Sequence, residues 1–327
     1  MRTRALRMVA AAFLLTTTVA AAVAKETGYL FVSSERDNAI AVLDPDSFKV
    51  VKLIPTADRP RHLQFNAERT MIYVACGEGG SIDVIDVAKL KVVERFENID
   101  DPEMFDLGPE GRFLYVSLED DGALGVLDLE QGELVAEIEV GEEPEGVLVA
   151  PDGRFVYVTS EVANTVHVVD AEKREVVANI VTGNRPRRMA LTPDLSELWV
   201  SNELAGTVSV IDPETRKPIA TIEFLPQGFR PEQVTPVGIT MTDDGKTAFV
   251  SLGRANHVAV VDVASRQIEK YLLVGKRAWN ATLDRDNRRL FVVNGLSDDI
   301  SIIDVENLKV IRSVPVGRVP HTLLIDD

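Results

Sequence analysis

A tripeptide of two aliphatic residues and an aspartate recurs seven times, and its spacing constrains the fold more than any other feature of this chain. Successive aspartates are 42 residues apart, except for one interval of 50; they are Asp44, Asp86, Asp128, Asp170, Asp212, Asp262 and Asp304. A column of aromatic residues follows the same spacings and comprises Phe31, Tyr73, Tyr115, Tyr157, Trp199, Phe249 and Phe291. A regular period of this length indicates a protein built from one repeated supersecondary unit.

Each unit divides into four short, valine-rich runs separated by Pro, Asp and Gly, which is the pattern of strands and turns. In the third unit we expect strands over Glu145–Ala150, Phe155–Ser160, Asn164–Asp170 and Val176–Val181. Seven such units predict an all-β, seven-bladed β-propeller of four-stranded blades. The repeated aspartates are expected to cap the turn that follows each of them.

The two ends of the chain predict how the ring closes. The first unit begins with the aromatic strand Tyr29–Ser33 and lacks the strand that precedes it in every other unit. The final segment, Pro320–Asp326, resembles that missing strand. We therefore expect the C-terminal strand to complete the N-terminal blade, which leaves no exposed edge and gives a closed, monomeric ring.

Residues 1–24 have the form of a cleaved signal peptide, with Arg2, Arg4 and Arg7 before an apolar run and Ala22-Val23-Ala24 at the end. This predicts a periplasmic protein that consists of residues 25–327 and has no membrane span after processing. The 52 acidic and 35 basic residues give a net charge of −17, which disfavours nucleic acid and anionic lipid as partners. A single cysteine excludes an internal disulfide and a cysteine-held iron–sulfur cluster.

The repeated motifs FVSS, YVAC, YVSL, YVTS, WVSN, FVSL and FVVN, each followed by a VID-like strand, resemble those of the YVTN family of β-propellers. With the longer sixth unit and the closing HTLLIDD, the chain is most similar to the PQQ-dependent catabolism-associated β-propeller proteins. That resemblance implies an exported protein that accompanies quinoprotein alcohol oxidation and its transport systems. It does not imply PQQ as a catalytic cofactor, because quinoprotein dehydrogenases have eight blades and a tryptophan docking repeat.

Departures from the repeat predict a binding face. The loops before each innermost strand and those between the aromatic and aspartate strands should share one end of the ring, which we call the upper face. The eight-residue insertion near Phe224–Pro231 belongs to this face and could act as a lid or a partner contact. The candidate ligand- or partner-binding residues are His62, Glu103, Glu145, Arg187, Arg188, Arg230, Trp279, Asn280 and His321.

Carboxylates also gather in three neighbouring upper loops, and oxygen ligands of this kind suit Ca²⁺ or a lanthanide ion. The candidate metal ligands are Asp100, Asp101, Glu103, Glu119, Asp120, Asp121, Glu142, Glu143 and Glu145. Arginines come from loops across the ring, so the sequence predicts a separation of negative and positive charge on the upper face.

Three functions fit these features. The first is a non-catalytic propeller that binds a small ligand or a periplasmic partner protein through its upper face. The second is a protein that binds or delivers Ca²⁺ or a lanthanide ion. The third is a lactonase-like enzyme, although the sequence contains no motif for an activated nucleophile.

Overall fold

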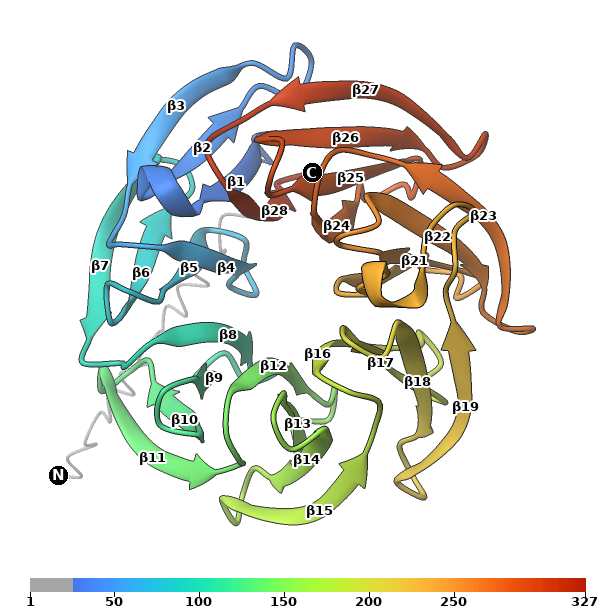
Figure 1. Ribbon diagram of the computed structural model, residues 1–327. Coiled ribbons are helices and arrows are strands. Elements are labelled where there is room, and N and C mark those ends of the chain that lie inside the picture. The colour runs from blue at the N-terminus through green and yellow to red at the C-terminus, as the bar shows by residue number, and fades with distance from the viewer. Residues whose placement is uncertain (1–25) are drawn as a thin grey trace, which may run out of the picture.

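The computed structural model describes residues 26–327, which form seven sheets of four antiparallel strands around a central channel (Figure 1). This confirms the predicted seven-bladed β-propeller. The predicted signal peptide, residues 1–24, lies outside the described part of the chain. No helix within residues 26–327 is both long enough and apolar enough to span a bilayer.

The blades are numbered along the chain, and each runs from an inner strand at the channel to an outer strand at the rim (Figure 1). Blade 1 contains β28 (Pro320–Ile325), β1 (Leu30–Ser34), β2 (Ala39–Leu43) and β3 (Val50–Pro55). Blade 2 contains β4 (Pro60–Phe65), β5 (Met71–Cys76), β6 (Ser81–Asp86) and β7 (Lys91–Glu97). Blade 3 contains β8 (Pro102–Leu107), β9 (Phe113–Leu118), β10 (Ala123–Asp128) and β11 (Glu133–Glu139).

The remaining blades repeat this pattern. Blade 4 contains β12 (Pro144–Val149), β13 (Phe155–Ser160), β14 (Thr165–Asp170) and β15 (Glu175–Val181). Blade 5 contains β16 (Pro186–Leu191), β17 (Leu198–Asn202), β18 (Thr207–Asp212) and β19 (Lys217–Glu223). Blade 6 contains β20 (Ile239–Met241), β21 (Thr247–Ser251), β22 (His257–Asp262) and β23 (Gln267–Leu273). Blade 7 contains β24 (Ala278–Leu283), β25 (Arg289–Asn294), β26 (Asp299–Asp304) and β27 (Lys309–Pro315). Two short 3₁₀ helices, η1 (Glu35–Asp37) and η2 (Pro231–Gln233), lie in upper loops.

The ring closes as predicted. Strand β28 pairs antiparallel with β1, so that Leu30 lies opposite Ile325 and Val32 opposite Leu323. Asp326 extends this closure, because its side chain accepts hydrogen bonds of 2.7 Å from both the backbone N–H and the hydroxyl of Thr27. Figure 1 shows the consequence, with the red C-terminal strand inside the blue N-terminal blade.

Each repeated aspartate caps the turn between the third and fourth strands of its blade. Asp44 accepts a hydrogen bond from the backbone N–H of Ser47, and Asp170 accepts one from that of Lys173. Matching bonds occur at the other five positions, Asp86, Asp128, Asp212, Asp262 and Asp304. The seven aspartates are therefore turn caps, as the sequence predicts.

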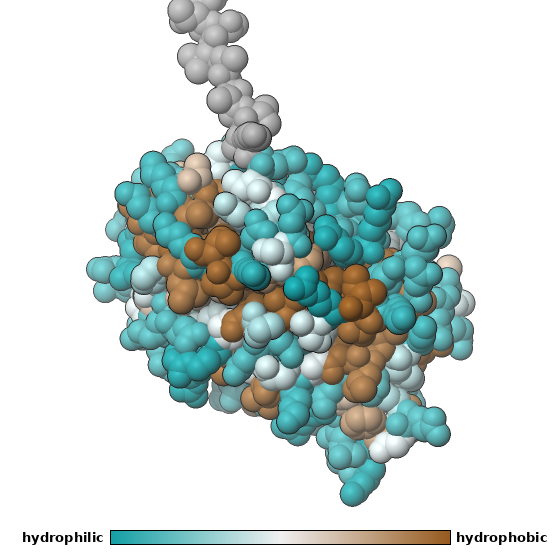
Figure 2. All heavy atoms as spheres, turned by 90° about the horizontal axis from the view of Figure 1, so that it is seen from above, coloured by the Kyte–Doolittle hydropathy of each residue, from teal (hydrophilic) through white to brown (hydrophobic). Residues whose placement is uncertain are grey.

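The apolar cores lie between neighbouring blades. Most residues of the aromatic column are buried there, and Phe31 and Trp199 are fully inaccessible to solvent. The seam where the ring closes is built in the same way, because Leu30 and Leu323 of blade 1 belong to the same cluster as Phe291 of blade 7. The flank in Figure 2 is largely hydrophilic with apolar patches, and the outer strands carry exposed apolar residues such as Leu53 and Ile311.

The insertion in the sixth unit shortens an inner strand. Strand β20 has three residues, whereas the other inner strands have six. Phe224 at the start of the insertion is buried in the core between blades 5 and 6, and the Phe229 ring packs edge-on against His257. Apolar contacts therefore anchor the insertion to the fold beneath it.

Candidate ligand site at the upper mouth of the channel

The loops that the sequence assigns to the upper face do lie together. Glu161, which follows β13, donates a backbone hydrogen bond to the carbonyl of Glu143, which precedes β12. Glu203 makes the equivalent bond to Arg185 in the next blade. The residue before the inner strand is left-handed in six blades, with φ between 36° and 62°, and these residues are Arg59, Asp101, Glu143, Arg185, Arg277 and Val319.

Hydroxyl groups then fix the inner strands of adjacent blades relative to one another. The Thr159 hydroxyl of blade 4 accepts a 2.7 Å hydrogen bond from the Gly146 N–H and donates a 2.9 Å bond to the Arg187 carbonyl of blade 5. Ser117 makes the same bridge from blade 3 to the Glu145 carbonyl of blade 4. These bridges hold the backbones of the residues directly after the inner prolines, whose side chains surround the mouth.

A cavity of about 330 Å³ occupies this upper mouth. Its charged lining has six arginines and three glutamates, namely Arg59, Arg61, Arg185, Arg187, Arg254, Arg277, Glu119, Glu145 and Glu203, and it is completed by Leu204 and Trp279. Arginines thus outnumber acids in the mouth, whereas the chain as a whole has a net charge of −17. Arg254 is exposed and makes no ion pair with any residue in 26–327.

Arg187 is the centre of one ion-pair network. It contacts the carboxylates of Glu145, Glu161 and Glu203, and only 7% of its side chain is exposed. Burial by itself would lower the pKa of Arg187, but these three carboxylates outweigh it and raise the pKa. Burial would likewise raise the pKa of Glu145, but Arg187, Arg188 and other arginines lower it to about 2. Both groups are therefore charged at neutral pH.

A second network spans blades 1, 2 and 3. Arg59 pairs with Asp101 at 2.9 Å and also with Glu103, and Arg61 pairs with Glu103 and with Glu35. Positive and negative side chains from neighbouring blades therefore meet around the mouth. The predicted separation of acidic and basic sectors is wrong here, because arginines that come from different blades reach the carboxylates.

The nine candidate metal ligands are divided by the fold. Asp101, Glu103 and Glu119 bring ligand atoms within 4.8 Å of one another. Arg59 and Arg61 already bind two of these three carboxylates. Glu145 pairs with Arg187 and Arg188 instead, Glu143 lies 3.9 Å from Arg185, and Asp100, Asp120, Asp121 and Glu142 are exposed.

The other candidate residues differ in burial: some line the cavity, some are buried beside it, and Arg230 is exposed. Trp279 lines the cavity, where the Arg277 and Arg187 guanidinium groups lie 4.4 and 5.5 Å from its ring. His321 is fully buried beside it, with Nε2 3.2 Å from Arg61 Nη2. Asn280 donates a hydrogen bond to the backbone carbonyl of His321.

The last three candidates lie away from the cavity wall. His62 packs edge-on against Phe105, and burial together with the charge of Arg188 lowers its pKa to about 3. Arg188 is buried next to the cavity and contacts Glu145. Arg230 is 79% exposed on the insertion, where it pairs with Glu232, and it does not line the cavity.

Our selection from the sequence missed Arg59, Arg61, Glu161 and Glu203, although the repeat contains a signal for them. Arg61 occupies the same position after the proline column as Glu103, Glu145 and Arg187. Glu161 and Glu203 share a position four residues after the aromatic column.

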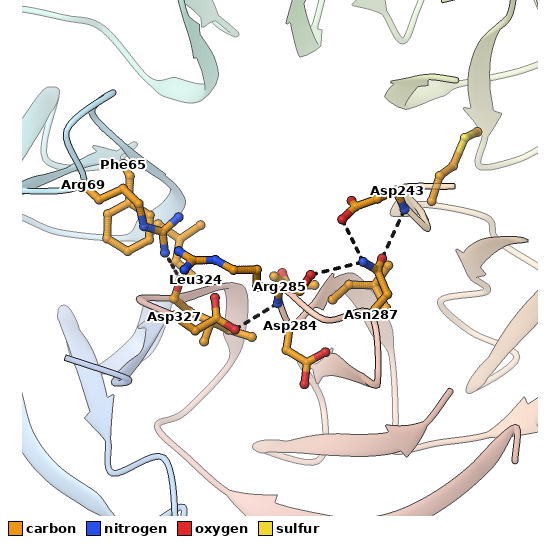
Figure 3. A pocket seen from close by; sticks show the side chains of 12 residues that line it. Phe65, Arg69, Asp243, Asp284, Arg285, Asn287, Leu324 and Asp327 are labelled. Carbon is orange, nitrogen blue, oxygen red and sulfur yellow. Dashed lines mark hydrogen bonds between the residues drawn. The ribbon is translucent and has the colours of Figure 1, made fainter. Parts of the chain in front are cut away.

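The lower mouth is also hollowed, by a cavity of about 300 Å³ near the C-terminus, but its polar groups bind one another (Figure 3). The Asn287 amide donates a 2.8 Å hydrogen bond to Asp243, and the Asp327 carboxylate accepts one from the Arg285 N–H. The Arg69 guanidinium stacks 4.3 Å above the Phe65 ring. The two hydrogen bonds connect blades 1, 6 and 7, and Arg69 ties blade 2 to them by donating to the Ile325 carbonyl of blade 1, which favours a structural role for this end of the channel.

Two family models match parts of the chain. Residues 68–187 match the cytochrome D1 heme domain, and residues 169–310 match the seven-bladed β-propeller lactonase family. Each match covers less than half of the chain. No curated protein matches the sequence.

Solved structures share the fold at low identity. Hydrazine synthase of Kuenenia stuttgartiensis has a TM-score of 0.77 and 17% identity over 90% of this chain and 99% of that chain. The periplasmic gluconolactonase PpgL of Pseudomonas aeruginosa has a TM-score of 0.76 and 21% identity over 91% and 98%. The dihydro-heme d1 dehydrogenase NirN, in complex with DHE, has a TM-score of 0.70 and 17% identity over 93% and 76%. At these identities the likeness shows the fold alone, and the chain is a seven-bladed β-propeller.

Proposed function

We propose that this chain is an exported, non-catalytic binding propeller that takes a small anionic ligand in its upper mouth. The observation that carries this proposal is the lining of the cavity, where six arginines face three glutamates in a protein of net charge −17. Five of these arginines also pair with carboxylates, whereas Arg254 makes no ion pair within residues 26–327 and so offers its charge to an anion.

The ligand that fits best carries carboxylates. Arginine forms paired hydrogen bonds with carboxylate oxygens, and the planar guanidinium group favours planar partners. Arg254 makes no ion pair within residues 26–327, and Arg277 pairs with Glu203 but remains on the cavity wall. A cavity of about 330 Å³ lies within the range of small-molecule sites and is too small for a folded partner to enter.

The resemblance to PQQ-dependent catabolism-associated propellers supports a role in periplasmic quinoprotein oxidation or in its transport systems. PQQ itself is a planar quinone with three carboxylates, so it is a reasonable probe of the mouth as a bound ligand rather than as a catalytic cofactor. The partial match to the cytochrome D1 heme domain is consistent with a propeller that binds a small ligand.

Calorimetric titration with PQQ, and separately with citrate, tests the proposal. The double substitution Arg254→Gln with Arg277→Gln should weaken binding about tenfold, because two charge-assisted contacts are lost. The matched control is Arg230→Gln, which removes an exposed upper-face arginine that lies outside the cavity. Equal affinity in the double variant and the wild type, or a larger loss in the control, would place the ligand elsewhere.

A lactonase-like activity is the second candidate, supported by the lactonase family match and by the likeness to the gluconolactonase. Burial raises the pKa of Glu161 to about 7 against the opposing charges of Arg187 and Arg185, and a carboxylate with that pKa can take a proton from water. Arg185 could then stabilise the oxyanion that forms as the water oxygen attacks the lactone carbonyl. Glu161 lies behind the cavity arginines rather than on the wall, which ranks this function second.

Hydrolysis of gluconolactone is the corresponding assay. If the protein is a lactonase, Glu161→Gln should abolish turnover, whereas the exposed control Glu232→Gln should retain it. We expect wild-type protein to hydrolyse the lactone no faster than buffer does.

A further inference from the structure

Arg188 reaches from blade 5 past blade 4 to blade 3, just below the upper mouth. It belongs to β16 of blade 5, yet its Nη1 lies 2.9 Å from the sulfur of Met104 in β8 of blade 3. Gly146 stands at the corresponding position of the intervening blade 4. A Cβ atom there would lie 2.1 Å from the Arg187 carbonyl oxygen, so the close approach of the inner strands requires glycine. Because Gly146 has no side chain, it leaves the path from Arg188 to Met104 open.

The charge of Arg188 is poorly compensated. Its Nη2 lies 3.1 Å from Glu145 Oε1, but that oxygen is at the same distance from Arg187, and Nη2 has no hydrogen-bond acceptor among residues 26–327. Burial lowers the pKa of Arg188 to about 10, and the charges of Arg187 and Arg61 oppose the help from Glu145. The neighbouring Arg187, with three carboxylates around it, has a raised pKa.

Met104 is a weak partner for this guanidinium group. A thioether sulfur accepts hydrogen bonds poorly, whereas a guanidinium group carries five donors and binds carboxylates strongly. Methionine is also flexible enough to move aside without disturbing a strand. Met104 is only partly buried, whereas Arg188 is buried, with 4% of its surface exposed. A carboxylate that replaced the sulfur would satisfy a buried cation.

We propose that Arg188 forms the inner end of the ligand site and binds a carboxylate that displaces the Met104 side chain from it. This inference rests on the proposed function of the mouth and specifies its ligand. One carboxylate binds at the rim near Arg254 and Arg277, and a second reaches down to Arg188. The ligand class is therefore an extended di- or tricarboxylate, and Met104 is the movable group between the two ends of the site.

The two sides of this contact predict opposite effects. Arg188→Gln should weaken the binding of PQQ or citrate about 10- to 100-fold, which is the range for losing hydrogen bonds to a charged group. Met104→Ala should strengthen binding several-fold, because the competing side chain is gone. Met241→Ala, at the lower end of the channel, is the matched control and should leave binding unchanged. Arg188→Lys, which keeps the charge but loses the fork, should give an intermediate loss and also serves if the glutamine variant does not fold.

Methyl NMR of ¹³C-methyl methionine gives a readout that does not depend on which ligand is native. Formate is small enough to reach Arg188 alone, so formate, citrate and PQQ should all shift the Met104 resonance, which Met104→Leu identifies. The formate shift should survive Arg254→Gln with Arg277→Gln but disappear in Arg188→Gln. If citrate or PQQ binds through the rim arginines while the Met104 resonance stays fixed, the inference is overturned and the mouth site stands. If no carboxylate binds or shifts the resonance, both are overturned.

Discussion

Closing the ring with β28 should make Leu323 as important to stability as any core leucine within a continuous blade. Leu323 is fully buried in the seam between blades 1 and 7 and pairs with Val32 of β1, almost 300 residues away in sequence. Leu63 is its structural equivalent in blade 2, because it also stands three residues after the inner proline and is 1% exposed. The two leucines differ in how their strands are connected. Strand β4 is joined directly by the chain to the next strand of its blade, whereas β28 is held in blade 1 only by its pairing and packing.

Replacing a fully buried leucine by alanine costs about 2–5 kcal/mol, from lost burial and the cavity that remains. A chain of about 300 residues has an unfolding entropy of roughly 0.6 kcal/mol per kelvin near its midpoint. The melting temperature should therefore fall by about 3–8 °C for Leu323→Ala, and by a similar amount for Leu63→Ala. Leu296→Ala should change it by less than about 1 °C, because that side chain is 68% exposed.

Differential scanning calorimetry of the three variants and the wild type measures these shifts directly. Deleting Pro320–Asp327 should lower the melting temperature far more than Leu323→Ala, because it exposes the edge of β1 along with the seam. A Leu323→Ala protein that melts like the wild type while Leu63→Ala is destabilised would refute the closure. It would mean that β28 is not docked in solution.

Three further predictions concern the mouth. Glu145→Gln should lower the unfolding free energy at pH 7 by about 3–5 kcal/mol, measured by urea denaturation, because Arg187 and Arg188 lose a buried counter-charge; the exposed control Glu142→Gln should have no effect. The arginines hold the pKa of Glu145 at about 2, against 4.5 in the unfolded chain. Its ionised form therefore contributes about 3 kcal/mol to stability above pH 4.5, and this contribution is lost as the pH falls towards 2. Wild type and Glu145→Gln should converge in stability over that interval. Thr159→Val should lower the unfolding free energy by about 1–3 kcal/mol in the same assay, because the N–H of Gly146 and the carbonyl of Arg187 lose their buried hydroxyl partner. An effect below about 0.5 kcal/mol would count against hydroxyl bridging between blades. Luminescence titration with Tb³⁺ and calorimetry with Ca²⁺ should show little metal binding to wild type and tighter binding to Arg59→Gln, because Arg59 competes with the metal for Asp101 and Glu103. Tight binding to wild type that is lost in Glu119→Gln would instead favour the metal-binding function.

Much of the fold could be predicted from the sequence because the signals are local and repeated. In blade 4 the predicted Phe155–Ser160 matches β13, and the other three strands agree to within a residue at either end. Strand alternation and turn chemistry act over a few residues, and seven aligned copies fix the register of both. The orphan strand at each end was sufficient to predict the closure.

The position of the candidate site could be predicted from the sequence, but the contacts among its side chains could not. The positions after the inner prolines do surround the mouth, and Arg187, Glu145 and Trp279 lie on its cavity. The expected division of charge failed, because Arg59 and Arg61 reach the carboxylates of blade 3. Arg230 was expected at the mouth, but it does not line the cavity and pairs with Glu232 on the insertion that Phe224 anchors.

The chain by itself thus determined the number of blades, their strands, the closing strand and the end of the ring where irregular residues gather. The tertiary structure decided which charges meet there. Arg187 and Arg188 are neighbours in sequence, but a shift in strand register between Pro186 and Met189 interrupts the regular alternation of the inner strand. One arginine then enters a network of three carboxylates, and the other reaches past blade 4 to a methionine 84 residues away. Such contacts depend on how closely seven inner strands converge, a distance that packing between blades sets and that no local sequence pattern records.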